Sequence, residues 1–185
     1  MKANFLTTLR THLMTPVVAD APALYALIDA DRENLARWMP RTASLKSVED
    51  EAAYLFRSQE RIASNQFWLA VIWVGNRPAG TIDLHNFQNG HAEIGYWLGR
   101  DFRGRGIMTH VLGIVEDVAF SQLDLHQLDL HQLELIIATA NTASRAVAQR
   151  RRFHQDGILR EHLLTASGNY DDAVVYTKLA REFET

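Results

Sequence analysis

Two glycines flank an arginine in the segment Gly104-Arg105-Gly106, where a predicted strand turns into a predicted helix. Residues without a side chain let a ligand approach the backbone closely, and the free N–H groups at the beginning of a helix carry positive potential. This combination suits a phosphate or pyrophosphate group. Because glycine before a helix also serves as a simple turn, the loop alone predicts an anion site without naming its ligand.

Two common nucleotide motifs do not fit this loop. The dinucleotide-binding pattern Gly-x-Gly-x-x-Gly needs a third glycine where Thr109 stands, and it normally opens a parallel sheet. The phosphate loop of nucleoside triphosphatases needs Gly-Lys-Ser/Thr, which the chain lacks. Neither class of nucleotide-binding protein is therefore predicted.

Candidate proton acceptors lie on the strands before the loop. Strand alternation places Asp83 and His85 on one face of their predicted strand. On the next strand it groups Glu93 with Gly95 and Trp97. A carboxylate or an imidazole can take the proton that an amine must lose before it acts as a nucleophile. The structural alternatives are a solvated Glu93 and a simply hydrogen-bonded His85.

The composition limits the chemistry further. Of the 185 residues 47% are hydrophobic, which is enough for one globular core, so we expect a single domain over residues 1–185. The absence of cysteine excludes a cysteine nucleophile and a thiolate zinc site. A net charge of -3 disfavours a nucleic-acid partner. Because there is no long apolar run and no signal-peptide pattern, we expect a cytoplasmic protein with no membrane partner.

Hydrophobic periodicity predicts the elements that must position these residues. Helical spacing predicts a mostly helical N-terminal third, with one helix capped by Asp20 and another by a Ser47/Asp50 capping box. Runs rich in β-branched and aromatic residues predict strands over 67–74, 80–87 and 92–98. Because Asn89-Gly90 is typical of a two-residue hairpin, these strands should form an antiparallel meander.

The second half of the chain alternates between strands and helices. We expect a helix over 107–120, a strand over 133–138, a helix that begins near Asn141 or Ser144, and a hairpin of strands 158–164 and 173–179. Helices, a meander, a β-α-β unit and a final hairpin predict a mixed α/β fold.

A pentad, Leu-Asp-Leu-His-Gln, occurs at 123–127 and again at 128–132. A five-residue step reverses strand parity, and it does not collect the leucines on one helix face either. We interpret it as a tandem duplication that lengthens a solvated loop. A metal role for His126 and His131 is the less favoured alternative, so no metal is expected.

Five motifs follow one another along the chain: Ala92-Glu-Ile-Gly-Tyr-Trp-Leu98, Arg103-Gly-Arg-Gly-Ile-Met108, Asn141-Thr-Ala-Ser-Arg-Ala-Val147, Phe153 with Asp156-Gly157, and Tyr170-Asp-Asp-Ala-Val-Val-Tyr176. Together they resemble the GCN5-related N-acetyltransferases, the GNAT superfamily, and within it the RimJ/RimL type that acetylates ribosomal-protein N-termini. The resemblance implies the GNAT fold, a central and mostly antiparallel sheet with a splayed parallel strand pair, flanked by helices.

The resemblance implies acetyl-CoA as the donor and an amine as the acceptor. In the family, the backbone of the strand before the glycine loop pairs with the pantetheine arm, which assigns that contact to Tyr96, Trp97 and Leu98. The N–H groups of the loop hold the CoA pyrophosphate, which assigns that contact to Arg103, Gly104, Arg105, Gly106, Ile107 and Met108. Asn141 and Ser144 complete the implied CoA contacts.

The resemblance also implies a catalytic role for Ser144. Many superfamily members protonate the departing thiolate with a tyrosine, but that position is Ala148 here. RimL-like members place a serine where Ser144 stands, which implies that Ser144 protonates or stabilises the thiolate. An ordinary helix N-cap is the alternative for this residue.

The remaining roles are left open between candidates. Either Glu93 or His85 is expected as the base, and a backbone N–H around Trp97 or Leu98 is expected to hold the oxyanion. The RimL catalytic glutamate has no clear counterpart in the segment 160–164. Arg152 replaces the glycine usual before Phe153, and we interpret the basic run at 150–152 as a solvated helix end rather than a phosphate contact.

The sequence thus predicts an acetyl-CoA-dependent N-acetyltransferase that acts by direct attack in a ternary complex, most simply on a protein N-terminal α-amine. A small-molecule amine such as a polyamine, amino acid or antibiotic is the alternative acceptor. A non-catalytic CoA-binding module is the alternative from another class. The sequence does not specify the oligomeric state.

Overall fold

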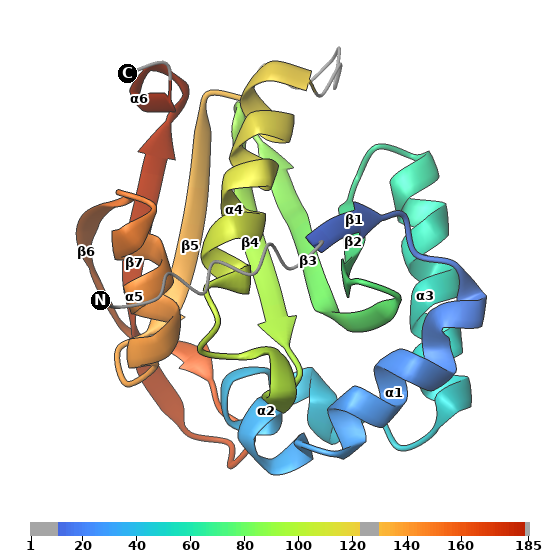
Figure 1. Ribbon diagram of the computed structural model, residues 1–185. Helices are drawn as coiled ribbons and strands as arrows, with labels where there is room; N and C mark the ends of the chain where they lie inside the picture. The colour runs from blue at the N-terminus through green and yellow to red at the C-terminus, as the bar shows by residue number, and fades with distance from the viewer. Residues whose placement is uncertain (1–10, 123–129, 184–185) are drawn as a thin grey trace, which may run out of the picture.

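A single seven-stranded sheet organises the computed structural model, which describes residues 11–122 and 130–183 (Figure 1). The strands run in the order β1-β2-β3-β4-β5-β7-β6, and every neighbouring pair is antiparallel except β4 with β5. Their bounds are β1 Thr11–Met14, β2 Trp68–Val74, β3 Arg77–Gln88, β4 His91–Leu98, β5 Gln132–Ala138, β6 His154–Leu164 and β7 Tyr170–Leu179.

Helices cover both faces of this sheet and create two hydrophobic cores. Helices α1 (Ala21–Asp29), α2 (Arg32–Trp38) and α3 (Val48–Ala63) bury their apolar residues with Trp97 and neighbouring β2 residues. Helices α4 (Ile107–Asp117) and α5 (Thr142–Arg150) pack over the other face with Ile94 and Leu98. A short α6 (Ala180–Phe183) follows β7. The mixed α/β class and the predicted opposite orientation of Trp97 and Ile94 are both confirmed.

The parallel pair β4–β5 is paired over three residues only. Its register joins His91–Glu93 to residues 132–134, and Glu93 opposite Glu134 is the last pair. Beyond that point the two strands diverge toward the lower end of the view in Figure 1, with α4 in front of them. The splayed strand pair that the resemblance implied is therefore present.

Several local signals act as the sequence predicts. Ser47 Oγ accepts from the Asp50 N–H and the Asp50 carboxylate accepts from the Ser47 N–H, which is a complete capping box for α3. Asn89 and Gly90 both have positive φ, at 52° and 76°, as a primed hairpin turn between β3 and β4 requires. The capping box thus fixes where α3 begins, and the turn fixes where β3 passes into β4.

The N-terminal third departs from the prediction in two places. Asp20 is the N-cap residue of α1 as predicted, but its side chain makes no capping hydrogen bond, because its carboxylate accepts from the Val17 N–H of the preceding 3-10 turn. The chain also begins its described part with strand β1, paired antiparallel to β2, which helical periodicity did not reveal.

The duplicated pentad lies mostly outside the described residues, since 123–129 are not described. Among the described residues no helix is long and apolar enough to cross a membrane.

The basic run at the end of α5 is not one solvated face. Arg151 turns inward and forms a bidentate pair with fully buried Glu116, at 2.9 and 2.8 Å, while Arg152 stays exposed with a φ of 58°. Glu116 also accepts from Lys178 of β7 at 2.7 Å. This triad ties α4, the end of α5 and β7 together. The interpretation of the run as a solvated helix end is therefore wrong for Arg151.

Replacing Glu116 with glutamine should destabilise the fold by about 3 kcal/mol, because buried Lys178 and partly buried Arg151 would lose the carboxylate that compensates them. Urea unfolding of the wild type and the variant measures this difference. The matched control is Asp117→Asn, one residue further along α4 and exposed, for which we expect a change below about 0.5 kcal/mol. Equal effects of the two substitutions would contradict the importance of the triad.

Candidate active site

Beyond Glu93, β4 and β5 diverge and leave an opening between them, which we call the splay. The splay exposes an unpaired stretch of β4 backbone. The Gly99 N–H, directly after β4, donates to Ala79 O of β3 at 2.8 Å. Because backbone groups alternate in an antiparallel ladder, Trp97 then bonds to β3, whereas Tyr96 and Leu98 turn their N–H groups toward the opening. Pairing with β5 has already ended at Glu93. Of the two predicted oxyanion donors, the register therefore favours the Leu98 N–H over that of Trp97.

The glycine loop lies directly after this free edge. Gly106 is the N-cap of α4 with a φ of 75°, a conformation that a side chain disfavours, and a Cβ there would meet nothing within 4 Å. The N–H groups from Gly104 to Met108 donate to no backbone acceptor in the described part of the chain. The loop therefore presents free donors and the positive end of α4 to solvent, as an anion site requires.

Within this loop, Arg103 has a different task from its neighbours. Its Nε donates to Leu98 O at 2.8 Å, and its Nη2 lies 2.5 Å from Asp31 Oδ2. Asp31 also pairs with Arg100 at 3.3 Å and is only 6% exposed. Burial would raise the pKa of Asp31, but the arginines outweigh it and hold that pKa below its ordinary value. The Arg103 side chain thus braces the loop against β4 and the α1–α2 turn.

Neither Asp31 nor Arg100 was predicted as part of the site from the sequence. The sequence around each residue is typical of a solvated helix end. Their contacts could not be read from it, because they join positions about seventy residues apart, as in the bond from Arg100 Nη2 to Ala30 O at 2.8 Å. The signal available in the sequence was the charge of Asp31 between two short helices. That signal does not identify its partners.

The splay is crossed on the α4–α5 side by a pair of hydroxyl groups. Tyr96 Oη of β4 lies 2.8 Å from Ser144 Oγ of α5, and both side chains are partly buried. Burial raises the pKa of Tyr96 to about 12. The structure thus brings a residue predicted to contact CoA together with the predicted thiolate-stabilising residue.

The beginning of α5 determines how Ser144 is presented. Asn141 is the N-cap, and its Oδ1 accepts from the Ser144 N–H at 3.2 Å. Ser144 is therefore the third helical residue, and its interpretation as an N-cap is wrong. Ala148, one turn further, is fully buried in the core. No tyrosine could occupy that position without displacing core residues.

On the opposite face of the sheet, the predicted proton acceptors form one cluster. His85 Nδ1 lies 2.7 Å from Asp83 Oδ1, and His85 Nε2 lies 3.5 Å from Glu93 Oε2. Asn86 Nδ2 donates to the same Glu93 oxygen at 2.8 Å. Strand alternation predicted that Asp83 and His85 share a face of β3, and their contact confirms it. The contact of His85 with Glu93 shows that the two strands present these groups on the same face of the sheet.

Burial and pairing oppose each other in this cluster. Burial alone would lower the pKa of His85, but the Asp83 and Glu93 carboxylates outweigh it and raise the pKa to about 9. Burial would raise the pKa of Glu93, but His85 and Asn86 lower it below its ordinary value. Burial raises the pKa of Asp83 despite its bond to His85. At neutral pH the cluster therefore holds an imidazolium beside an ionised Glu93.

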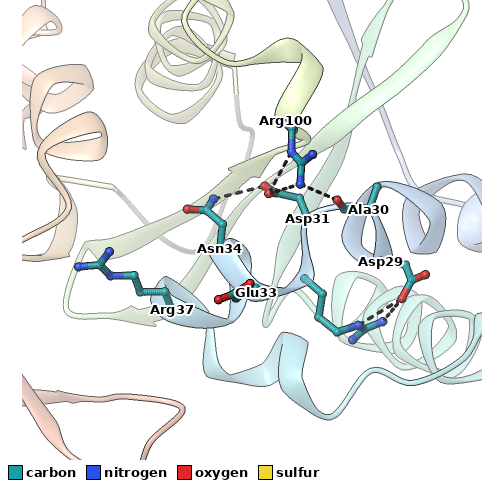
Figure 2. Close-up of a pocket in the computed structure, with 8 residues that line it drawn as sticks. Asp29, Ala30, Asp31, Glu33, Asn34, Arg37 and Arg100 are labelled. Carbon is teal, nitrogen blue, oxygen red and sulfur yellow. Dashed lines mark hydrogen bonds and ion pairs between the residues drawn. The ribbon is translucent and has the colours of Figure 1, made fainter.

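A pocket also opens beside the turn between α1 and α2, and Figure 2 shows the side chains around it. Its charged groups are largely paired with one another: Arg32 Nη2 with Asp29 at 2.9 Å, and Arg100 with Asp31. None of its lining residues comes from β5 or α5, so it is separate from the splay. The described residues contain no group of three or more acidic or histidine side chains placed to hold a metal ion.

Comparisons with known proteins agree with this architecture. The acetyltransferase (GNAT) domain family matches residues 10–154. The YdaF protein of Bacillus subtilis (strain 168), named as a ribosomal N-acetyltransferase, is 30% identical over an alignment that covers 99% of this chain and 96% of YdaF. Both findings extend over the β4–β5 opening and the glycine loop.

Two solved structures share the fold. RimL, a ribosomal L7/L12 alpha-N-protein acetyltransferase in complex with coenzyme A, has a TM-score of 0.86 at 22% identity, with 93% of this chain and 95% of RimL covered. The microcin C7 self-immunity acetyltransferase MccE, in complex with acetyl-CoA and AMP, has a TM-score of 0.83 at 24% identity, with 91% and 92% covered.

The chain therefore belongs to the GNAT family of N-acetyltransferases. Within that family it is similar to YdaF, which is named as a ribosomal N-acetyltransferase, and it shares its fold with RimL.

The raised pKa of His85 predicts a pH-dependent contribution to stability. A group whose pKa is higher in the folded state stabilises the fold fully below its unfolded pKa of about 6.5, and this contribution is lost as the pH rises through about 9. In urea unfolding, the stability advantage of the wild type over His85→Gln should therefore shrink between these two pH values. A difference that stays constant over this range would contradict the imidazolium–carboxylate pairing.

Proposed function

We propose that this chain, as one domain over residues 1–185, transfers the acetyl group of acetyl-CoA to an amine, with a protein N-terminal α-amine as the acceptor. The observation that carries the proposal is the unpaired β4 edge at Tyr96 and Leu98, which leads directly into the glycine loop at the beginning of α4. One extended ligand with amide groups at one end and a pyrophosphate at the other fits this arrangement. The pantetheine arm and pyrophosphate of CoA have that chemistry.

In this proposal the donor occupies the α4–α5 side of the splay. The pantetheine amides add to the free β4 edge as an extra strand would, and the pyrophosphate accepts from the loop N–H groups between Gly104 and Met108. Asn141 and Ser144, at the beginning of α5, border the thioester end. The N–H of Leu98 is the donor available for the oxyanion that forms when the amine attacks the thioester carbonyl.

The acceptor amine approaches from the other face of the sheet. Glu93 lies on that face, at the last position of β4 that pairs with β5 before the strands diverge. An attacking amine must first lose a proton. His85 is protonated at neutral pH because of its raised pKa, so it is not available as the base there. We assign proton acceptance, directly or through one water, to Glu93, which stays ionised, and a positioning role to His85 and Asn86.

Two observations support a protein N-terminus as the acceptor. An α-amino group has an ordinary pKa near ~8, so a weak carboxylate base suffices for it, whereas an alkyl amine near ~10.4 needs more help. The names of YdaF and RimL also refer to ribosomal proteins. A ribosomal or other protein N-terminus is therefore preferred over a small-molecule amine, which remains the alternative acceptor.

Saturating acetyl-CoA should raise the unfolding temperature by roughly 5 to 10 °C, because a ligand at a hundred times its Kd adds ~2.7 kcal/mol to the native state. NADH and ATP serve as ligand controls. Gly106→Ala should reduce the shift by placing a side chain where the pyrophosphate approaches. Gly168→Ala is the matched control, because Gly168 also has positive φ and open surroundings but lies in the β6–β7 turn. No shift with acetyl-CoA would refute the proposal.

Glu93→Gln should lower kcat/KM for an N-terminal peptide about 100-fold, since general-base assistance contributes at least that much. CoA release measures the rate, with Glu134→Gln on the neighbouring strand as the control. Peptides that begin with serine or alanine are compared with polyamines, amino acids and aminoglycosides. Turnover of the small amines alone would replace the protein acceptor with a metabolite. Acetyl-CoA binding without turnover of any amine would identify a non-catalytic CoA-binding module.

A further inference from the structure

The hydroxyl pair Tyr96–Ser144 is a direct bridge between the two elements that border the splay. Tyr96 comes from the free edge of β4 and Ser144 from the first turn of α5, and their oxygens lie 2.8 Å apart. Among the described residues Ser144 Oγ has no other hydrogen-bond partner. Either oxygen of the pair could be the donor, and Tyr96 Oη also lies 3.4 Å from Ser144 O, so the contact allows two orientations of the Ser144 proton.

We propose that Tyr96 is a positioning residue, whose hydroxyl donates to Ser144 Oγ and so turns the Ser144 proton toward the sulfur of CoA. The inference rests on the proposed function and extends it to a residue whose side chain no sequence motif had assigned. The Tyr96 backbone contact with pantetheine is a separate role. Tyr96 does not touch the reacting atoms in this inference but acts through Ser144.

The geometry fixes both partners before a ligand binds. The Tyr96 ring packs against the core formed by α4 and the sheet, and the Ser144 backbone is held by its cap to Asn141 Oδ1 at 3.2 Å. If Tyr96 donates, Ser144 Oγ retains one proton with no acceptor among the described residues. A partly buried hydroxyl without an acceptor favours a ligand atom that can supply one, and a thiolate does so.

The chemistry of the two hydroxyls agrees with this direction of donation. With its pKa raised to about 12, Tyr96 stays protonated at neutral pH and is a poor source of a proton for a thiolate of ordinary pKa near ~8.5. It is therefore suited to donating a hydrogen bond rather than to giving up its proton. Ala148 occupies the usual tyrosine position, so this hydroxyl reaches the region from β4 instead of from α5.

The transfer step balances with Ser144 as a hydrogen-bond donor. The ammonium first loses one proton to the base, and the amine nitrogen then attacks the thioester carbon to form the new C–N bond. The nitrogen of the tetrahedral intermediate releases its second proton to water. The C–S bond breaks and its electron pair remains on sulfur, which leaves as the CoA thiolate. The Ser144 hydroxyl, held by Tyr96, stabilises that charge until the thiolate takes a proton from water.

The test compares CoA with desulfo-CoA, which lacks the sulfur. Binding of each ligand to the wild type, Tyr96→Phe, Ser144→Ala and the double variant is measured by calorimetry at a pH where free CoA is largely thiolate. We expect Tyr96→Phe to weaken CoA about tenfold, the typical effect of one hydrogen bond to a charged group, and to leave desulfo-CoA unchanged. The double variant should be no weaker than Ser144→Ala alone, because Tyr96 acts through Ser144.

A matched control separates positioning from packing. Tyr176→Phe on β7 also removes a tyrosine hydroxyl, which accepts from Arg145 and donates to Gln155, each at 3.3 Å. It should leave the ratio of the two affinities unchanged. In turnover, Tyr96→Phe should lower kcat about tenfold with KM for acetyl-CoA unchanged.

Each other outcome would overturn the inference. Equal weakening of CoA and desulfo-CoA by Tyr96→Phe would show a merely structural tyrosine, and additive losses in the double variant would show that Tyr96 acts independently of Ser144. If the wild type binds neither ligand, the proposed function fails and this inference fails with it. If the wild type binds both ligands and Tyr96→Phe changes neither affinity, only the inference fails.

Discussion

The short parallel pairing of β4 with β5 is the constraint on which the rest of the site depends. A regular sheet would satisfy every backbone group of both strands, but pairing that stops at Glu93 leaves the next stretch of β4 unbonded. Charged side chains hold the two borders apart. The Asp31–Arg103 pair fixes the glycine loop to the α1–α2 turn, and the Glu116–Arg151 pair fixes α5 to α4 on the other border. Unsatisfied backbone is tolerated here because the opening is bordered by rigid elements.

The sheet also separates two kinds of chemistry. The side with α4 and α5 has neutral hydroxyls and a helix N-terminus, whereas the side with α1 to α3 has the charged cluster around His85. Under the proposed function this division keeps the stabilisation of a departing thiolate away from the groups that take the amine proton. A single mixed cluster would let the imidazolium pair with the thiolate and compete with the acceptor.

The sequence predicts the elements better than the long-range contacts. Strand alternation correctly placed Asp83 and His85 on one face of β3, because a two-residue period fixes the face of a strand. The contact of His85 with Glu93 across the two strands was not predicted. The short edge strand β1 was missed because four residues carry little periodicity. The partners of Asp31, Glu116 and Tyr96 were not predictable, since each contact joins elements between 35 and 72 residues apart and depends on how helices pack on the sheet.

One absent side chain couples two positions of the sequence. A Cβ on Gly95 would lie 2.8 Å from Asp83 Oδ2, so the Asp83 carboxylate occupies the space that any larger residue at 95 would need. The two positions are therefore not free to vary independently in descendants of this chain. A lineage that gains a side chain at 95 should first shorten the residue at 83, and would lose a charge beside His85 in doing so. Gly95 thus keeps the Asp83 carboxylate beside His85 by leaving space for it, and not through any bond that Gly95 makes.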